Sequence, residues 1–151
     1  MNILAIDPGT YESAYVVWDG KKILGYDKVD NHKMLKLIAD PPWDVDLLAV
    51  ERVASYGQRV GQEVFDTCMW TGRFIQAAAA EMLEFKLIYR MTIKKHLIGS
   101  HTAKDADIRQ RLLDIVGPQG KKASPGPTYG IKSDCWQALA LGYVCYETEE
   151  R

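Results

Sequence analysis

The spacing of apolar and polar residues divides the chain into short strands and longer helices. Runs rich in apolar and β-branched residues predict five strands, at 2–6, 13–19, 22–29, 45–51 and 85–90. Asp19 and Gly20 separate the second run from the third and predict a hairpin. Helical spacing predicts helices over 31–40, 62–84, 92–99, 102–117 and 133–147, with Asn31 and Thr92 as N-terminal caps. There is no internal repeat, so we expect a single domain over residues 1–151.

The order of these elements predicts the fold class. Strands that follow one another through short turns form an antiparallel meander, whereas strands that return through a helix pair in parallel. We therefore expect an α/β fold with a mixed five-stranded sheet. It should combine an antiparallel three-strand meander with parallel strands, and carry helices on both faces.

Two of the predicted strands end on a carboxylate. Asp7 follows the apolar run "ILAI", and Glu51 closes "VDLLAVE". In α/β sheets functional groups collect at the carboxyl ends of strands, and two close carboxylates need either a proton or a cation. Asp134, at the start of the last helix, is placed to join them. Oxygen ligands suit Mg²⁺ or Mn²⁺, while no Cys or His spacing supports zinc.

Each of these acids also has a simpler interpretation. Asp7 precedes Pro-Gly and could be a turn former, and Asp134 could be only a helix cap. Glu51 could pair with Arg52 or Arg59. These alternatives do not explain why two strands of similar pattern both end on an acid.

Composition is typical of a globular protein with an ordinary core. Hydrophobic residues make up 47% of the 151 residues, and charged residues 26%. No apolar run reaches the roughly 20 residues of a membrane span, and the N-terminus lacks a basic region, so neither a span nor a signal peptide is expected. The odd number of cysteines on apolar segments suggests reduced core thiols and a cytoplasmic location.

Net charge is −1 overall but is unevenly distributed. Residues 86–132, the basic segment, contain ten Lys or Arg and three Asp or Glu, a net charge of +7. Local asymmetry of this kind favours an anionic partner. The alternative is a solvated helix face.

The stretches "ILAIDPG", "LLAVERV" and "SDCWQALALG", in this order and spacing, resemble the three motifs of RuvC-type Holliday-junction resolvases, with a phage-type RuvC-like branch included. The resemblance covers almost the whole chain and implies an RNase H-like fold. It further implies a homodimeric endodeoxyribonuclease that nicks opposing strands of a four-way DNA junction symmetrically, leaving 5′-phosphates. Such proteins work in the bacterial cytoplasm, encoded by the bacterium or by a phage, in DNA recombination and repair.

The resemblance also implies the site residues. Asp7, Glu51 and Asp134 match the catalytic carboxylates, which hold Mg²⁺ or Mn²⁺, two ions per active site. Gln137 stands where the family often has another acid, so it could be a weak ligand, contact DNA or simply pack. Ala54 replaces the family's junction-probing aromatic, and Tyr56 is the obvious substitute, unless it packs under its own loop.

Basic residues near "TIKKHLIGSHTAKD" are expected to bind DNA phosphates, which need Lys or Arg rather than a base code. The candidates are Lys94, Lys95 and Lys104. Lys121 and Lys122 lie in a Pro/Gly-rich loop, where they could close over DNA or only keep the loop soluble.

The helix expected over 62–84 is apolar around most of its circumference, which predicts cover on more than one side. A second subunit could provide that cover, because two active sites related by a two-fold axis would match two strands of one junction. The candidate interface residues are Val64, Phe65, Met69 and Phe74. The alternative is an unusually well-buried core helix.

Three other functions remain open. A broader branched-DNA or flap endonuclease of the same fold would fit the departures at Ala54 and Gln137. A catalytically weak junction-binding module would fit if Gln137 weakens a metal site. An actin- or hexokinase-type nucleotide binder would fit the "DPGT" turn, but such proteins need two such domains.

Overall fold

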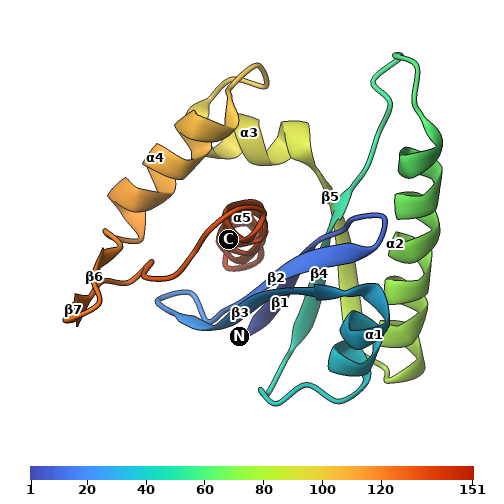
Figure 1. The fold of residues 1–151 in the computed structure, drawn as a ribbon, viewed down its shortest axis with the longest axis horizontal. Coiled ribbons are helices and arrows are strands. Elements are labelled where there is room, and N and C mark those ends of the chain that lie inside the picture. The colour runs from blue at the N-terminus through green and yellow to red at the C-terminus, as the bar shows by residue number, and fades with distance from the viewer.

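The computed structural model describes all 151 residues and contains the predicted mixed sheet (Figure 1). The strand order is β3-β2-β1-β4-β5, in which β1 pairs antiparallel with β2 and parallel with β4. The five strands are β1 (Ile3–Asp7), β2 (Glu12–Trp18), β3 (Ile23–Asp30), β4 (Leu47–Arg52) and β5 (Glu84–Tyr89). The meander β1-β2-β3 and the parallel strands β4 and β5 confirm the predicted fold class.

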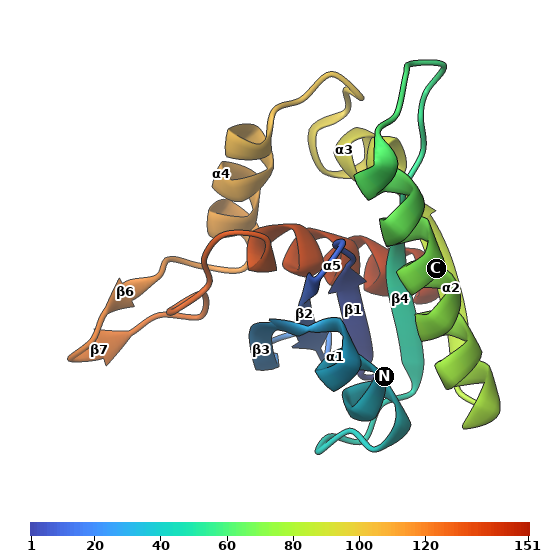
Figure 2. The same cartoon turned by 45° about the vertical axis from the view of Figure 1, so that its right-hand side comes forward.

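Helices cover both faces of the sheet, with one layer of helices on one face and two layers on the other. The helices are α1 (Asn31–Ala39), α2 (Gln62–Ala80), α3 (Arg90–Ile98), α4 (Asp105–Ile115) and α5 (Cys135–Glu149). Helices α1 and α2 lie on one face, and α5 crosses the other (Figures 1 and 2). Helices α3 and α4 pack on α5 from outside, so that side of the sheet carries two layers.

The alternation of side chains along β1 supplies two separate cores. Ile3 and Ala5 face α5, whereas Leu4 and Ile6 face α1 and α2. Because both faces of the central strands are buried, the sequence reads as continuous apolar runs rather than as an alternating pattern.

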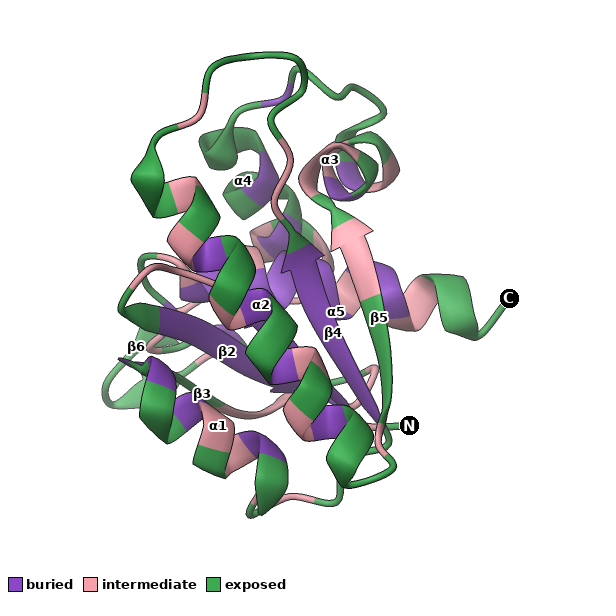
Figure 3. Cartoon of the chain, turned by 90° about the vertical axis from the view of Figure 1, so that its right-hand side faces the viewer, coloured by how far each residue is buried: buried purple, intermediate pink, exposed green.

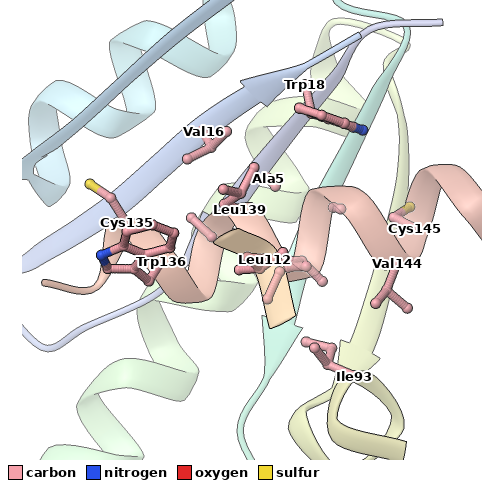
Figure 4. Close-up of a cluster of buried hydrophobic side chains, with 14 of the residues drawn as sticks. Ala5, Val16, Trp18, Ile93, Leu112, Cys135, Trp136, Leu139, Val144 and Cys145 are labelled. Atoms are coloured by element: carbon pink, nitrogen blue, oxygen red, sulfur yellow. The ribbon is translucent and has the colours of Figure 1, made fainter. Parts of the chain in front are cut away.

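Helix α5 lies very close to the sheet because its contact face is made of small residues. A Cβ placed on Gly142 would lie 3.2 Å from the Cβ of Ala5 and 3.4 Å from that of Trp18. Leu139 fills the space beside Ala5 and Val16 (Figure 4). This close packing fixes the position of the N-terminal end of α5, and with it Asp134.

Several predicted boundaries and caps were wrong in detail. Asp30, not Asn31, caps α1, and its carboxylate accepts from the Lys33 amide at 3.0 Å. Helix α3 begins at Arg90, before Thr92. Segment 118–130 contains a short hairpin of β6 (Gly120–Lys121) and β7 (Ser124–Pro125), which projects from the body (Figure 2).

The cysteines are free thiols, as expected, but they are not all in the core. Cys135 and Cys145 are buried, whereas Cys68 is exposed on α2. None of the helices combines the length and the apolar character needed to cross a membrane.

Candidate active site

Strand register brings Asp7 and Glu51 together. Ile6 of β1 is opposite Val50 of β4, so the next residues on the two parallel strands, Asp7 and Glu51, are neighbours. Ala5 and Ala49, two residues earlier, face α5, and the alternation of a strand therefore directs both acids to the same face. The two strands that end on these acids are thus direct neighbours in the sheet.

The same row of the sheet carries a cation that the sequence analysis missed. Asp7 is opposite Ala14 of β2, and Ala14 is opposite Lys28 of β3. Lys28 Nζ donates to Asp134 Oδ2 at 2.7 Å. The small side chain of Ala14 separates Lys28 from Asp7. Across the sheet, the order of the charged side chains is therefore Lys28, Asp7 and Glu51.

A buried polar network holds the turn that follows Asp7. Ser13 Oγ accepts from the Gly9 amide at 3.1 Å and donates to Asn31 Oδ1 at 2.6 Å. Asn31 Nδ2 donates to the Gly9 carbonyl at 2.9 Å. Gly9 is required because a Cβ there would lie 2.2 Å from the Glu12 carbonyl oxygen. The expected capping role of Asn31 is therefore replaced by a role in fixing this turn.

Glu51 is almost buried and is bound by an arginine from the next strand end. Arg90 Nη1 lies 3.3 Å from Oε1 and 3.2 Å from Oε2 of Glu51. The other terminal nitrogen, Nη2, donates to Asp105 Oδ1 at 2.5 Å. Neither Arg52 nor Arg59, the partners proposed from the sequence, pairs with Glu51: its salt bridge is to Arg90, and Arg52 stacks over the Tyr89 ring.

Asp134 precedes α5 without capping it. Its side chain makes no capping hydrogen bond and is half exposed, and its partner is Lys28. The residue before it, Ser133, has a φ of 51°, a left-handed conformation that is unusual for serine. The interpretation of Asp134 as only a helix cap is therefore wrong.

Burial and mutual repulsion at the carboxyl edge of the sheet disfavour the ionisation of Asp7, Glu51 and Asp134 together. Burial, followed by the negative charges of Glu51 and Asp134, raises the pKa of Asp7 to about 8. Burial also raises the pKa of Glu51, against the opposing effect of Arg90. The nearby positive charges therefore compensate the acids only in part, so a further cation would bind favourably here.

The donor chemistry fits a hard divalent cation, although the side chains do not surround one. Asp7, Glu51 and Asp134 offer only oxygen ligands. No three Asp, Glu, His or Cys side chains lie close enough together to hold a metal ion as they stand. Glu51 and Asp134 bond to Arg90 and Lys28 instead, so metal binding requires those two contacts to change.

Gln137 lies beside Asp134 in an open hollow between the N-terminal ends of α4 and α5. The hollow, about 370 Å³ in volume, is also lined by Asp105 and Arg109. Arg109 stacks over Trp136, with 5.1 Å between Cζ and the ring centre. Gln137 is partly exposed, so it is accessible from this hollow rather than packed in the core.

Tyr56 lies on the loop between β4 and α2 and is 52% exposed. Packing under its own loop is therefore wrong for this residue. It has a φ of 49° and lines an apolar hollow of about 380 Å³ with Ala54, Tyr89 and Met91. The sequence analysis did not propose Tyr89. Its position at the carboxyl end of β5 was a possible signal, because Glu51 lies at the corresponding end of β4.

The predicted DNA-binding lysines fall into two groups. Lys94 on α3 is half-buried, and its charge lowers the pKa of Glu51, so it lies near the acids. Lys95 and Lys104 are exposed in the same region. Lys121 and Lys122 are exposed at the β6-β7 hairpin, away from α3 (Figures 1 and 2).

Helix α2 has a buried stripe and an exposed face (Figure 3), and the exposed face carries apolar side chains. Phe65 is 57% exposed, Met69 is 70% exposed, and Val64 is partly exposed. Phe74 is fully buried within the protomer, in the core formed with α1 and the sheet. Phe74 was therefore a wrong choice for an interface, whereas the other three residues are accessible.

Comparisons with known proteins support the class of fold. No protein-family model matches the sequence, and a search of curated proteins finds no match. Among solved structures, RuvC from Thermus thermophilus matches with a TM-score of 0.76 at 18% identity, over 99% of this chain and 97% of that chain. The same protein in complex with a Holliday junction substrate matches with a TM-score of 0.75 at 17% identity, over 99% and 96%.

A third structure extends the likeness beyond bacteria. The yeast mitochondrial Holliday junction resolvase Ydc2 matches with a TM-score of 0.62 at 10% identity, over 97% of this chain and 80% of that chain. The protein thus has an RNase H-like fold, and within that class its fold is of the RuvC type. The resemblance noted in the three sequence motifs is confirmed at the level of the fold.

Proposed function

We propose that the protein is a structure-selective endodeoxyribonuclease that resolves Holliday junctions. The observation that carries the proposal is the pair of acids Asp7 and Glu51 at the carboxyl edge of the sheet, with the negative charge of Asp134 acting on Asp7, in a fold of the RuvC type. One of the matching structures was solved with a Holliday junction. Branched DNA is accordingly the proposed substrate, cut symmetrically on opposing strands to leave 5′-phosphates.

Asp7, Glu51 and Asp134 are the proposed ligands of Mg²⁺ or Mn²⁺, with Gln137 as a weak additional ligand. Two bound ions would supply a nucleophile at neutral pH and stabilise the leaving oxygen. The chain itself positions the acids: the network of Ser13 and Asn31 fixes the turn after Asp7. Helix α5 fixes Asp134.

The basic residues around the acids are proposed to bind phosphates. Lys94, Lys95 and Lys104 would hold the DNA near the cut site, and Lys121 and Lys122 would contact an arm farther away. Tyr56, with Tyr89 beside it, would stack on a base that is unpaired at the crossover, a contact worth about 1–3 kcal/mol.

Replacing Lys94 should weaken junction binding in a salt-dependent way. We expect Lys94→Ala to lower the slope of log affinity against log salt by about one, because one phosphate contact is lost. Fluorescence anisotropy at several salt concentrations measures that slope. Lys21→Ala, at the opposite edge of the sheet, is the matched control and should leave it unchanged. Equal slopes for wild type and Lys94→Ala would exclude a phosphate contact for this lysine.

A homodimer is proposed through the exposed face of α2. We expect Met69→Glu to give a monomer, because it places a charge in the centre of an apolar contact. Sedimentation velocity measures the change. Met82→Glu is a matched control, because Met82 is 93% exposed beyond the end of α2 and should leave the dimer intact. A Met69→Glu protein that stays dimeric would place the interface elsewhere.

Substrate choice separates the proposed function from the alternatives. A resolvase should cut a four-way junction in Mg²⁺ far faster than a Y-fork or a linear duplex of the same sequences. Equal cutting of forks and flaps would indicate the broader nuclease. Tight binding without cutting in any metal would indicate the junction-binding module.

A further inference from the structure

Arg90 is the side chain that hydrogen-bonds to Glu51, and its contacts are unequal. A single nitrogen, Nη1, is shared between both Glu51 oxygens at 3.2 and 3.3 Å, which is long for a charged hydrogen bond. The other nitrogen, Nη2, is only 2.5 Å from Asp105 Oδ1. The guanidinium is thus held more closely by Asp105 than by Glu51.

The exposure of the two carboxylates also differs: Glu51 is buried, whereas Asp105 is exposed. Glu51 is 8% exposed, so bulk water cannot take the place of Arg90 beside it. If Arg90 moves away, the buried carboxylate needs another cation as its partner. The side chain of Asp105 is 64% exposed, at the start of α4, and has room to retain the arginine. Arg90 is therefore anchored at the rim of the site, and its tip reaches the buried acid.

We propose that Arg90 is a positioning residue that occupies Glu51 and competes there with a divalent cation, while Asp105 holds the arginine aside when the cation binds. The proposal rests on the proposed function, because it takes Glu51 as a metal ligand. A cation at Glu51 would displace only the long contact of Nη1, and the short contact of Nη2 would keep the guanidinium from being left unpaired.

Opposite effects on metal affinity follow for the two partners. Arg90→Gln should bind Mn²⁺ about five- to tenfold more tightly than wild type in the absence of DNA, because a competing charge is removed. Asp105→Asn should bind Mn²⁺ more weakly, because Glu51 becomes the only carboxylate that is hydrogen-bonded to Arg90. In the double variant the effect of Asp105→Asn should disappear, since the arginine through which it acts is absent.

The test is a titration of the DNA-free protein with Mn²⁺, in which free Mn²⁺ is measured by electron paramagnetic resonance. Arg111→Gln is the matched control: it removes a positive charge from α4, the helix that begins at Asp105, but Arg111 is exposed and makes no hydrogen bond to Glu51 or Asp105. It should change affinity less than twofold, by about 0.4 kcal/mol or less. Circular dichroism verifies that each variant is folded.

The outcomes separate this inference from the proposed function. Tighter binding by Arg90→Gln alone, with a non-additive double variant, supports it. Unchanged or weaker binding by Arg90→Gln, or additive effects in the double variant, would overturn it while the metal site stands. If Glu51→Gln binds Mn²⁺ as well as wild type does, Glu51 is not a ligand, and both the proposed metal site and this inference fail.

Discussion

Asp7→Asn is expected to abolish DNA nicking while leaving junction binding intact. The substitution keeps the size of the side chain but removes the charge that the metal needs. Since metal stabilisation of the transition state is worth several kcal/mol, and about 1.4 kcal/mol is tenfold in rate, we expect a loss of about 10³-fold or more. Single-turnover cleavage of a four-way junction, with binding measured in parallel, gives both quantities.

The control for this variant is an aspartate of the same chemistry at the opposite edge of the sheet. Asp44 is exposed just before β4, and Asp44→Asn should cleave at the wild-type rate. If Asp7→Asn still nicks the junction, Asp7 is not a metal ligand. If it fails to bind the junction as well, the loss of cleavage does not come from the chemistry of the site.

Asp7→Asn should also make the metal-free protein more stable at neutral and alkaline pH. In the folded protein, burial and the neighbouring acids raise the pKa of Asp7 to about 8, from 3.8 in a free chain. Ionising this carboxylate therefore opposes folding. The protonated carboxyl contributes favourably to the free energy of unfolding. This contribution is complete below about pH 4 and is lost as pH rises through about 8, with a slope of up to about 1.4 kcal/mol per pH unit.

Urea unfolding in the presence of a chelator between pH 5 and 8.5 measures this effect. The free energy of unfolding of wild type should fall with rising pH more steeply than that of Asp7→Asn, and the variant should be the more stable protein at pH 8. Mg²⁺ should narrow the difference, because a bound cation stabilises the folded wild type. Parallel pH profiles for the two proteins would show that Asp7 is ionised in the folded state without a penalty.

The acids could be found from sequence because strand pattern and register determine their positions. Asp7 and Glu51 each end an apolar strand, and alternation along β1 and β4 places both on the face of α5. The turn residues were harder to assign, since capping chemistry at Asn31 resembles the buried role it plays with Ser13. Local pattern was sufficient for the strands and insufficient for the polar contacts between them.

The cations at the site could not be predicted in this way. Lys28 lies 106 residues before Asp134, and Arg90 lies 39 residues after Glu51, so each contact depends on the packed fold. Arg90 carried a weak signal, because it follows a strand that is parallel to β4. Phe74 shows the converse limit: helical spacing revealed apolar residues on α2, but only packing decides which of them face the core.

Cleavage of an immobile four-way junction tests the central claim most directly. Each of the four strands is end-labelled in turn, and the junction is incubated with Mg²⁺ or with chelator. We predict single cuts at symmetric positions on two opposing strands, with ends that ligase can seal, in Mg²⁺ only. Cuts in the presence of chelator, unpaired cuts scattered along the arms, or no cut with Mg²⁺ or Mn²⁺ would contradict a metal-dependent resolvase.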